Sequence, residues 1–493
     1  MQKPEQYPAS ILSALPVPDK DRAKECLQKA MEGFDCKIVV LDDDPTGVQT
    51  VHDISVYTDW EENSVREGFQ EESSMFFILT NSRSFSEEKT AAVHRQIAER
   101  VKKISRETGK DYFLISRGDS TLRGHYPLEL DALAEGFRHT GAVSETPEDP
   151  GRSAGDTEEG IDGEILCPFF PEGGRVTFGN IHYVKEGDLL TPAGMTEFAR
   201  DKTFGYSASD LKEYVEEKTR GRKRAEDCIC ISLEELAALD TAGIEKKLLL
   251  AENRAVVIVN AVTYEDLEVF CAALVNAMKK GKHFLARTAA AFTRVMGRVT
   301  ERPLLTREEI RGEETRTGGL VIVGSHVEKT TRQLSCLKEA DLPAVFLEFD
   351  VNAIFRENGL AAERDKAAAL AEKAMKEGKT AVVYTSRQLL APENLSREEL
   401  LSISVKISDA LTGIVAGIGV RPGFLVAKGG ITSSDVGTRG LKVRKALVMG
   451  QIRKGIPVWR TGPESRFPGL AYIIFPGNVG EEETLREIAE ELA

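Results

Sequence analysis

The chain has 493 residues, of which 41% are hydrophobic and 29% charged, and its formal charge at pH 7 is −14. This length exceeds one ordinary hydrophobic core, so we expect a soluble protein of two or three domains. The negative charge argues against a nucleic-acid backbone or an acidic lipid surface as partner. No apolar run approaches 18 residues and no signal-peptide pattern is visible, so we predict no membrane contact and a cytoplasmic location. Seven scattered cysteines without a CxxC pair favour reduced thiols over disulfides or zinc.

The N-terminal half alternates short apolar runs with amphipathic stretches. After a helix predicted over 20–33, strands are predicted at 38–41, 75–79 and 112–115. A long helix begins after Ser86 and stops at Gly109, since serine is a preferred N-cap and glycine a preferred C-cap. This rhythm indicates a parallel sheet with helical crossovers, and therefore an α/β fold.

The first predicted strand runs directly into three acids, Asp42, Asp43 and Asp44, followed by Pro45 and Thr46. Ligands of open α/β sheets bind at the carboxyl ends of such strands. Adjacent carboxylates repel one another, and a divalent metal or a polyhydroxy substrate would relieve that repulsion. A solvated acidic turn, with Asp44 capping the following residues, is the alternative.

The next strands also end in polar residues that suit a small hydroxy acid. Carboxylates can orient hydroxyl groups, and arginines pair bidentately with a carboxylate. The carboxylates predicted to act in catalysis are Asp43, Asp44 and Asp119, and the residues predicted to bind substrate are Thr46, Arg83, Arg117, Ser120, Arg123 and Arg175. His125 and His182 are left out, because a lone histidine is more often structural.

Composition changes mark the domain organisation. Residues 142–163 are polar and rich in Glu, Pro and Gly, which indicates a surface insertion. A hairpin is predicted between about 176 and 190. The highly charged segment 306–318 is predicted to be a linker. We therefore expect a substrate-binding domain over 1–310 and a nucleotide-binding domain over 311–493, each with a largely parallel sheet flanked by helices.

The C-terminal part repeats one pattern four times: an apolar strand followed by a turn of small residues, after 323, 384, 427 and 475. Such turns offer backbone N–H groups and hydroxyls to a phosphate, although the P-loop pattern is absent and ordinary tight turns would look similar. The residues predicted to bind nucleotide are Gly324, Ser325, Lys428, Gly429, Gly430, Thr432, Ser433, Pro476, Gly477, Asn478 and Gly480.

Three functional interpretations compete at this point. A kinase would use the N-terminal acids and arginines on its acceptor and the C-terminal turns on the phosphates. A haloacid-dehalogenase-type phosphatase would use Asp42 and Asp44, which fit its hhhhDxDxT signature, but would leave the C-terminal half without a role. A sugar-acid or nucleotide sensor would bind the same ligands without chemistry.

The chain resembles the four-carbon acid sugar kinase family in several ordered motifs. The family's DDxTG matches Asp43 to Gly47, its DSTLRG matches Asp119 to Gly124, and its GGxTS and PGNxG match 429–433 and 476–480. An arginine-threonine-alanine segment appears at 287–289. The resemblance departs at Val327, where the family's GSxS motif has its second serine, and at Arg117, where a lysine is common.

The resemblance implies ATP-dependent phosphorylation of erythronate, threonate or 3-oxo-tetronate. It also implies magnesium-ATP as donor, an N-terminal substrate domain and a C-terminal nucleotide domain. A homo-oligomer is possible. Neither the stereochemistry of the substrate, nor the carboxylate that acts as base, nor the ligands of magnesium follow from the motifs.

Overall fold

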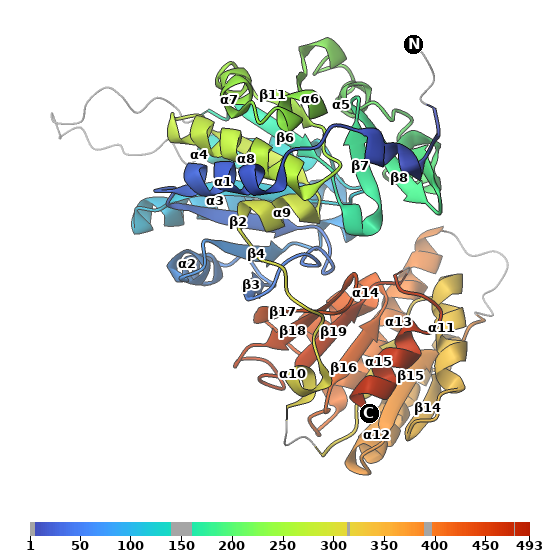
Figure 1. Ribbon diagram of the computed structural model, residues 1–493. Coiled ribbons are helices and arrows are strands. Elements are labelled where there is room, and N and C mark those ends of the chain that lie inside the picture. Colours follow the sequence, from blue (N-terminus) through green and yellow to red (C-terminus); the bar gives the residue numbers. More distant parts are fainter. Residues whose placement is uncertain (1–4, 140–159, 313–315, 389–396, 478) are drawn as a thin grey trace, which may run out of the picture. The chain divides into compact units, whose positions relative to one another are not determined.

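The computed structural model describes residues 5–139, 160–312, 316–388, 397–477 and 479–493 (Figure 1). The chain forms two compact units, and both are α/β with helices on the faces of a largely parallel sheet, which confirms the predicted fold class. Unit 1 comprises residues 1–43 and 59–300, and unit 2 comprises residues 44–58 and 301–493. Across the described ranges, no helix is both long and apolar enough to cross a membrane.

Unit 1 is built on a seven-stranded sheet in which all neighbouring strands run parallel. One of its strands, β2 (Cys36–Asp42), is buried at every position, as its continuous apolar run predicts for a strand covered on both faces. The strand order is β10 (Ile229–Ile231), β11 (Ala255–Val259), β6 (Gly163–Cys167), β12 (Phe284–Thr288), β5 (Asp111–Arg117), β2 (Cys36–Asp42) and β4 (Met75–Leu79).

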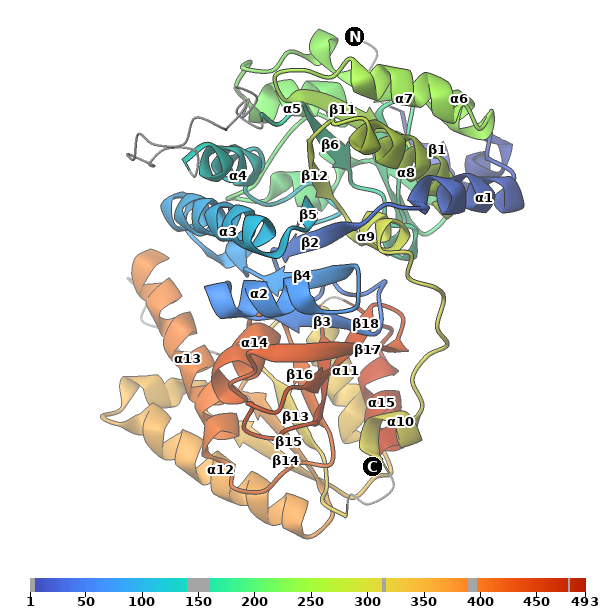
Figure 2. The same ribbon diagram turned by 90° about the vertical axis from the view of Figure 1, so that its left-hand side faces the viewer.

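Helices cover both faces of this sheet (Figure 2). α3 (Glu87–Thr108) packs with α4 (Leu128–His139) on one face, and α1 (Lys20–Met31) packs with α8 (Tyr264–Lys279) on the other. The predicted ends of α3 are confirmed, since the Ser86 side chain accepts a hydrogen bond from the Lys89 N–H and Gly109 is left-handed. The other α-helices in the described part of the unit are α2 (Glu62–Gln70), α5 (Leu211–Lys218), α6 (Leu233–Ala237), α7 (Thr241–Leu249) and α9 (Ala290–Met296).

A small antiparallel sheet completes unit 1. It contains the predicted hairpin, formed by β7 (Arg175–Phe178) and β8 (Ile181–Glu186), together with β9 (Leu189–Pro192) and β1 (Tyr7–Pro8). Of the predicted insertion over 142–163, residues 142–159 lie outside the described ranges, and Gly163 is already the first residue of β6.

Unit 2 has an eight-stranded mixed sheet. The four strands predicted to precede small turns run parallel to one another, with β14 (Ala344–Phe349) at the edge. Three antiparallel strands extend the other side, and the outermost, β3 (Ile54–Tyr57), comes from an early segment of the chain, residues 44–58. The order is β3 (Ile54–Tyr57), β17 (Lys445–Arg453), β18 (Ile456–Thr461), β19 (Ala471–Phe475), β16 (Leu425–Lys428), β13 (Leu320–Val323), β15 (Thr380–Thr385) and β14 (Ala344–Phe349).

Helices cover both faces of this sheet as well (Figure 2). α12 (Gly359–Lys376) packs with α13 (Arg397–Gly417), and α11 (Glu328–Lys338) packs with α15 (Thr484–Leu492). A short helix, α14 (Gly430–Asp435), follows β16.

The predicted linker is wrong in its first half. Thr306 caps a short helix, α10 (Arg307–Arg311), through a capping box with Glu309. Ile310 is buried in the hydrophobic core of unit 2, which explains why this charged stretch is ordered. The chain passes between the compact units at Thr300, ten residues before the predicted domain boundary, and residues 44–58 belong to unit 2.

Candidate functional site

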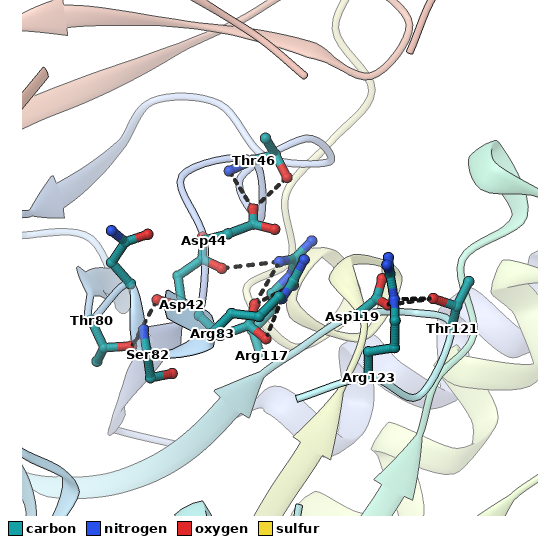
Figure 3. Close-up of polar contacts among 12 residues, drawn as sticks. Asp42, Asp44, Thr46, Thr80, Ser82, Arg83, Arg117, Asp119, Thr121 and Arg123 are labelled. Carbon is teal, nitrogen blue, oxygen red and sulfur yellow. Dashed lines mark hydrogen bonds and ion pairs between the residues drawn. The ribbon is translucent and has the colours of Figure 1, made fainter. Parts of the chain in front are cut away.

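At the carboxyl ends of β2, β4 and β5, the acids predicted from the sequence meet arginines (Figure 3). The Nη1 atom of Arg117 lies 3.1 Å from Asp42 Oδ1 and 3.4 Å from Asp43 Oδ1. Arg83 binds Asp43 bidentately, with Nε 3.1 Å from Oδ2 and Nη2 2.5 Å from Oδ1. Asp42 and Asp43 are 1% and 2% exposed, so their charges are balanced by guanidinium groups within the protein.

Asp119 occupies the loop after β5, together with Thr121 and Arg123 (Figure 3). The Nε atom of Arg123 donates to Asp119 Oδ2 at 2.6 Å, and the Thr121 hydroxyl donates to the same oxygen. Burial alone would raise the pKa of Asp119, but the charges of Arg83 and Arg123 outweigh it and hold that pKa well below its usual range. The carboxylate is therefore ionised at neutral pH.

Arg175 lies near the same loop, from the start of β7. The guanidinium groups of Arg123 and Arg175 stand 5.1 and 5.6 Å from the ring centroid of Phe198. Burial lowers the pKa of Arg175, and the charge of Arg123 lowers it further. Among the described residues, the buried Nε atom of Arg175 has no hydrogen-bond partner. An anion placed here would satisfy that donor and relieve the repulsion between the two arginines.

The loop from Gly118 to Gly124 wraps around the side chain of Arg287. A Cβ atom on Gly118 would lie 2.0 Å from the Arg287 guanidinium carbon, and one on Gly124 would lie 2.5 Å from Nη2. Arg287 Nη2 donates to the Arg123 carbonyl at 3.2 Å. Glycine is therefore required at both positions because the guanidinium occupies the space of a side chain.

Glu129, at the start of α4, holds Arg287 in place. Its carboxylate lies 2.5 Å from Arg287 Nη1 and accepts hydrogen bonds from the hydroxyls of Ser82 and Ser116 at 2.9 and 3.0 Å. Burial raises the pKa of Glu129, but the charge of Arg287, together with smaller contributions that include the Ser82 hydrogen bond, outweighs burial and lowers it. The sequence analysis missed Glu129, since a glutamate in the first turn of a helix is commonplace.

Ser120 and both excluded histidines make hydrogen-bonding contacts within unit 1. The Ser120 carbonyl lies 2.8 Å from His182 Nε2, and Thr177 Oγ1 lies 2.9 Å from His182 Nδ1. Burial lowers the pKa of His182 to about 4, so the ring is neutral at pH 7. His125 Nε2 lies 3.1 Å from the Phe85 carbonyl. The contacts of the two histidines are structural, and the contact of Ser120 uses its backbone carbonyl, not its hydroxyl.

Asp44 and Thr46 belong to unit 2, since the boundary falls between Asp43 and Asp44. The Thr46 backbone N–H donates to Asp44 Oδ1 at 2.7 Å, and the Thr46 hydroxyl donates to the same atom. Asp44 thus caps the turn that follows it, as the alternative interpretation of the sequence expected.

In unit 2, the small turns after β13 and β16 and the turn after β19 pack closely together. A Cβ atom on Gly324 would lie 2.2 Å from the Thr432 hydroxyl, one on Gly429 would lie 3.0 Å from the Ser325 Cβ, and one on Gly477 would lie 2.9 Å from the Ser325 hydroxyl. The structure therefore brings five predicted residues from three turns into one cluster.

The other predicted nucleotide-binding residues serve the turns in different ways. Lys428 points inward, with its Nζ atom 2.6 Å from the Pro476 carbonyl oxygen and 3.2 Å from the Gly477 carbonyl oxygen. The Ser433 hydroxyl donates to the Ala427 carbonyl at 2.8 Å. Gly430 is exposed with open space beside it, Gly480 is left-handed, and Asn478 lies outside the described residues.

Two family descriptions match the chain, one in each half. The family described as "Sugar-binding N-terminal domain" matches residues 38–296, and the one described as "Nucleotide-binding C-terminal domain" matches residues 320–485. The chain belongs to the family with this sugar-binding domain. It thus joins a sugar-binding and a nucleotide-binding domain in one polypeptide. Among curated proteins, no significant match was found.

Three solved structures match the chain, and the first two share its fold. A Salmonella typhimurium protein, provisionally described as a tRNA synthase, is 17% identical with a TM-score of 0.61, and the match covers 92% of this chain and 98% of that one. A Haemophilus influenzae protein of a family of unknown function is 18% identical with a TM-score of 0.55, covering 92% and 99%. A Bordetella bronchiseptica protein, described as a citrate-bound domain-swapped dimer, is 20% identical with a TM-score of 0.37, covering 92% and 98%.

The described residues of the two domains do not form a magnesium site from protein side chains alone. No group of three or more histidine, cysteine, aspartate or glutamate side chains could hold a metal ion within the described ranges. Asp42 and Asp43 contact arginines instead. These residues therefore do not form a preformed magnesium cage. Magnesium in phosphoryl-transfer sites does not need one, because it is commonly bound by one or two carboxylates and the phosphates of the nucleotide.

Proposed function

We propose that this protein is an ATP-dependent kinase that phosphorylates a hydroxyl of a four-carbon sugar acid, a tetronate or 3-oxo-tetronate. The observation that carries the proposal is the pair of arginines, Arg123 and Arg175, beside the ionised Asp119 in a chain whose other half matches a nucleotide-binding domain. A sugar acid has a carboxylate for the arginines and hydroxyls for the carboxylate, so its two chemical features match the two kinds of side chain.

The substrate carboxylate would bind at Arg175 and Arg123. The Nε donor of Arg175 is buried and has no partner among the described residues, so an arriving carboxylate gains a hydrogen bond without breaking one. Phe198 fixes the two guanidinium groups by packing against both. These contacts bind and orient the acceptor.

Asp119 would orient the attacking hydroxyl and accept its proton. The contacts of Arg123 and Thr121 use its Oδ2 atom, and its low pKa keeps the carboxylate ionised. Such a carboxylate is a weak base, but phosphoryl transfer through a loose transition state depends chiefly on positioning and charge stabilisation. Asp43 is less suited to this role, because Arg83 binds both of its oxygens.

The cluster of turns in unit 2 would bind the phosphates of ATP. Close packing of Gly324, Gly429 and Gly477 keeps side chains out of the space between the turns, so a phosphate group would be able to approach the backbone there. The N–H groups of Gly324 and Gly429 donate to the carbonyls of Lys428 and Phe475, so phosphate contacts would come from other groups of the turns. Magnesium would arrive with the nucleotide and neutralise phosphate charge. Lys428 would act indirectly by fixing the Pro476–Gly477 turn.

The phosphatase interpretation would need Asp42 as a nucleophile. Asp42 is 1% exposed and its Oδ1 atom contacts Arg117, which does not suit attack on a phosphate ester. A binding protein without catalysis would have the same ligand contacts. Measuring ATP consumption and phosphate release distinguishes both alternatives from the kinase.

The test is an ATP-consumption assay with magnesium and the purified full chain. The acceptors are D- and L-erythronate, D- and L-threonate and their 3-oxo forms. We expect turnover on at least one, loss of at least about 100-fold in kcat for Asp119→Asn, and a raised KM for Arg175→Lys. Asp111→Asn, at the opposite and exposed end of β5, is the matched control. Phosphate release from sugar phosphates without ATP consumption would instead support the phosphatase, and ligand binding without turnover the sensor.

A further inference from the structure

We propose that Arg387 binds a phosphate group of the nucleotide. The inference rests on the nucleotide-binding role in the proposed function and adds a residue that the motifs do not include. Arg387 follows β15, whose neighbour in the sheet is β13, with Tyr384 opposite Val323. The turn that carries Arg387 therefore lies beside the turn that begins at Gly324.

The orientation of the guanidinium leaves one of its edges available. Nη1 donates to the Ser325 carbonyl at 2.6 Å, which ties Arg387 to the Gly324–Ser325 turn. Nε and Nη2 are buried and have no hydrogen-bond partner among the described residues. These two nitrogens form the side of an arginine that binds a carboxylate or phosphate bidentately. Arg83 uses the same two nitrogens to bind Asp43 in unit 1.

Within the described part of unit 2, no carboxylate lies within ion-pair distance of Arg387. The nearby Glu348 accepts a hydrogen bond from the Tyr384 hydroxyl at 3.2 Å. His326, in the adjacent turn, adds no charge at neutral pH, because burial and the charge of Arg387 lower its pKa. A cation with two buried donors that are unsatisfied by any described residue suits an anionic ligand. In a nucleotide-binding domain the anionic part of the ligand is its phosphates.

Calorimetric titration of the full chain with ATP and with adenosine tests this assignment. The variants are Arg387→Lys, which keeps the charge but loses the bidentate edge, and Arg387→Gln, which loses both. We expect each to weaken ATP binding at least about tenfold and to leave adenosine binding unchanged. Unchanged adenosine binding also shows that the domain is folded. Arg356→Gln, which removes an exposed ion pair with Asp350 in the same unit, should change neither affinity.

ATP affinity that is unchanged in both variants would overturn the assignment. Equal loss of ATP and adenosine affinity in both variants would overturn it too, since losing a phosphate contact cannot lower the affinity for a ligand that has no phosphate. If the unaltered chain bound neither ligand, nucleotide binding itself would fail and the role of Arg387 with it. The readout is binding, so it does not depend on knowing the sugar acid.

Discussion

The buried pair of Glu129 and Arg287 determines how the Asp119 loop is held. The Glu129 carboxylate contacts Arg287 and two serine hydroxyls, and Arg287 in turn fills the space beside Gly118 and Gly124. Removing one partner of such a pair leaves a buried charge without compensation, which costs more free energy than the pair itself contributes.

We therefore predict that Glu129→Gln lowers the free energy of unfolding of unit 1 by about 3 kcal/mol. Trp60 lies in unit 1 and Trp459 in unit 2, and they are the two tryptophans of the chain. In a Trp459→Phe background, the fluorescence of Trp60 during urea unfolding would report on unit 1.

The matched control is Glu135→Gln on the same helix, which removes an exposed ion pair with Arg95. Exposed pairs contribute little, so a change below about 1 kcal/mol is expected. Equal effects of the two substitutions would contradict the structural role of Glu129.

Single residues were also the hardest part to predict from the sequence. The motifs identified Asp43, Asp119 and Arg123 as polar neighbours, and the structure places them at adjacent strand ends. Motifs do not reveal which partner a side chain finds in the folded state. Lys428 contacts backbone carbonyls and Asp44 caps its own turn, and both contacts depend on backbone geometry that residue type alone does not specify.

The shape of the loop after β5 depends on the close approach of the Arg287 guanidinium to the backbone at Gly118 and Gly124. Gly118 has an ordinary backbone conformation, but an added Cβ would meet the Arg287 guanidinium at 2.0 Å. We predict that Gly118→Ala displaces Arg287 and the loop, lowering kcat/KM on the accepted sugar acid at least about tenfold and destabilising unit 1 by 1–3 kcal/mol, roughly the cost of overpacking.

Gly417→Ala is the control for the same chemical change. Gly417 ends α13, and an added Cβ there would make an ordinary contact of 3.8 Å with Ala368. Activity and stability within experimental error of the unaltered chain are expected. If Gly118→Ala were equally silent, Arg287 would have to be able to move without disturbing the loop.

At the scale of elements the sequence was informative. Apolar runs and caps predicted the buried strands and α3 closely, because local periodicity and capping chemistry determine them. The prediction failed at α10, where one buried residue, Ile310, orders a segment whose composition indicated a linker. A single long-range contact leaves no periodic signal.

At the scale of the whole molecule, the chain passes between its units three times, after Asp43, after Thr58 and after Thr300. The sequence analysis expected one boundary, because the segment 44–58 is too short to show a change in composition. β3 from this segment pairs antiparallel with β17 over Ile54 to Tyr57, and its residues are buried. The nucleotide-binding unit is therefore completed by residues that precede most of the sugar-binding unit.

A single proteolytic cleavage near Thr300 should therefore leave the two fragments associated. We expect fragments 1–300 and 301–493, produced at an inserted protease site, to elute together in size-exclusion chromatography, because β3 of one remains in the sheet of the other. Val56→Asp, which places a charge at a buried position of β3, should weaken the association. Fragments that separate without that substitution would contradict this expectation.

The same strand bears on how such a chain can change by descent. Recombination at a single junction near Thr300 would join the β3 of one parent protein to the β17 of another. The two strands of such a chimaera would not have evolved to pair with each other. Exchange of whole units between relatives would require both segments to travel together, so the two halves are expected to share one history.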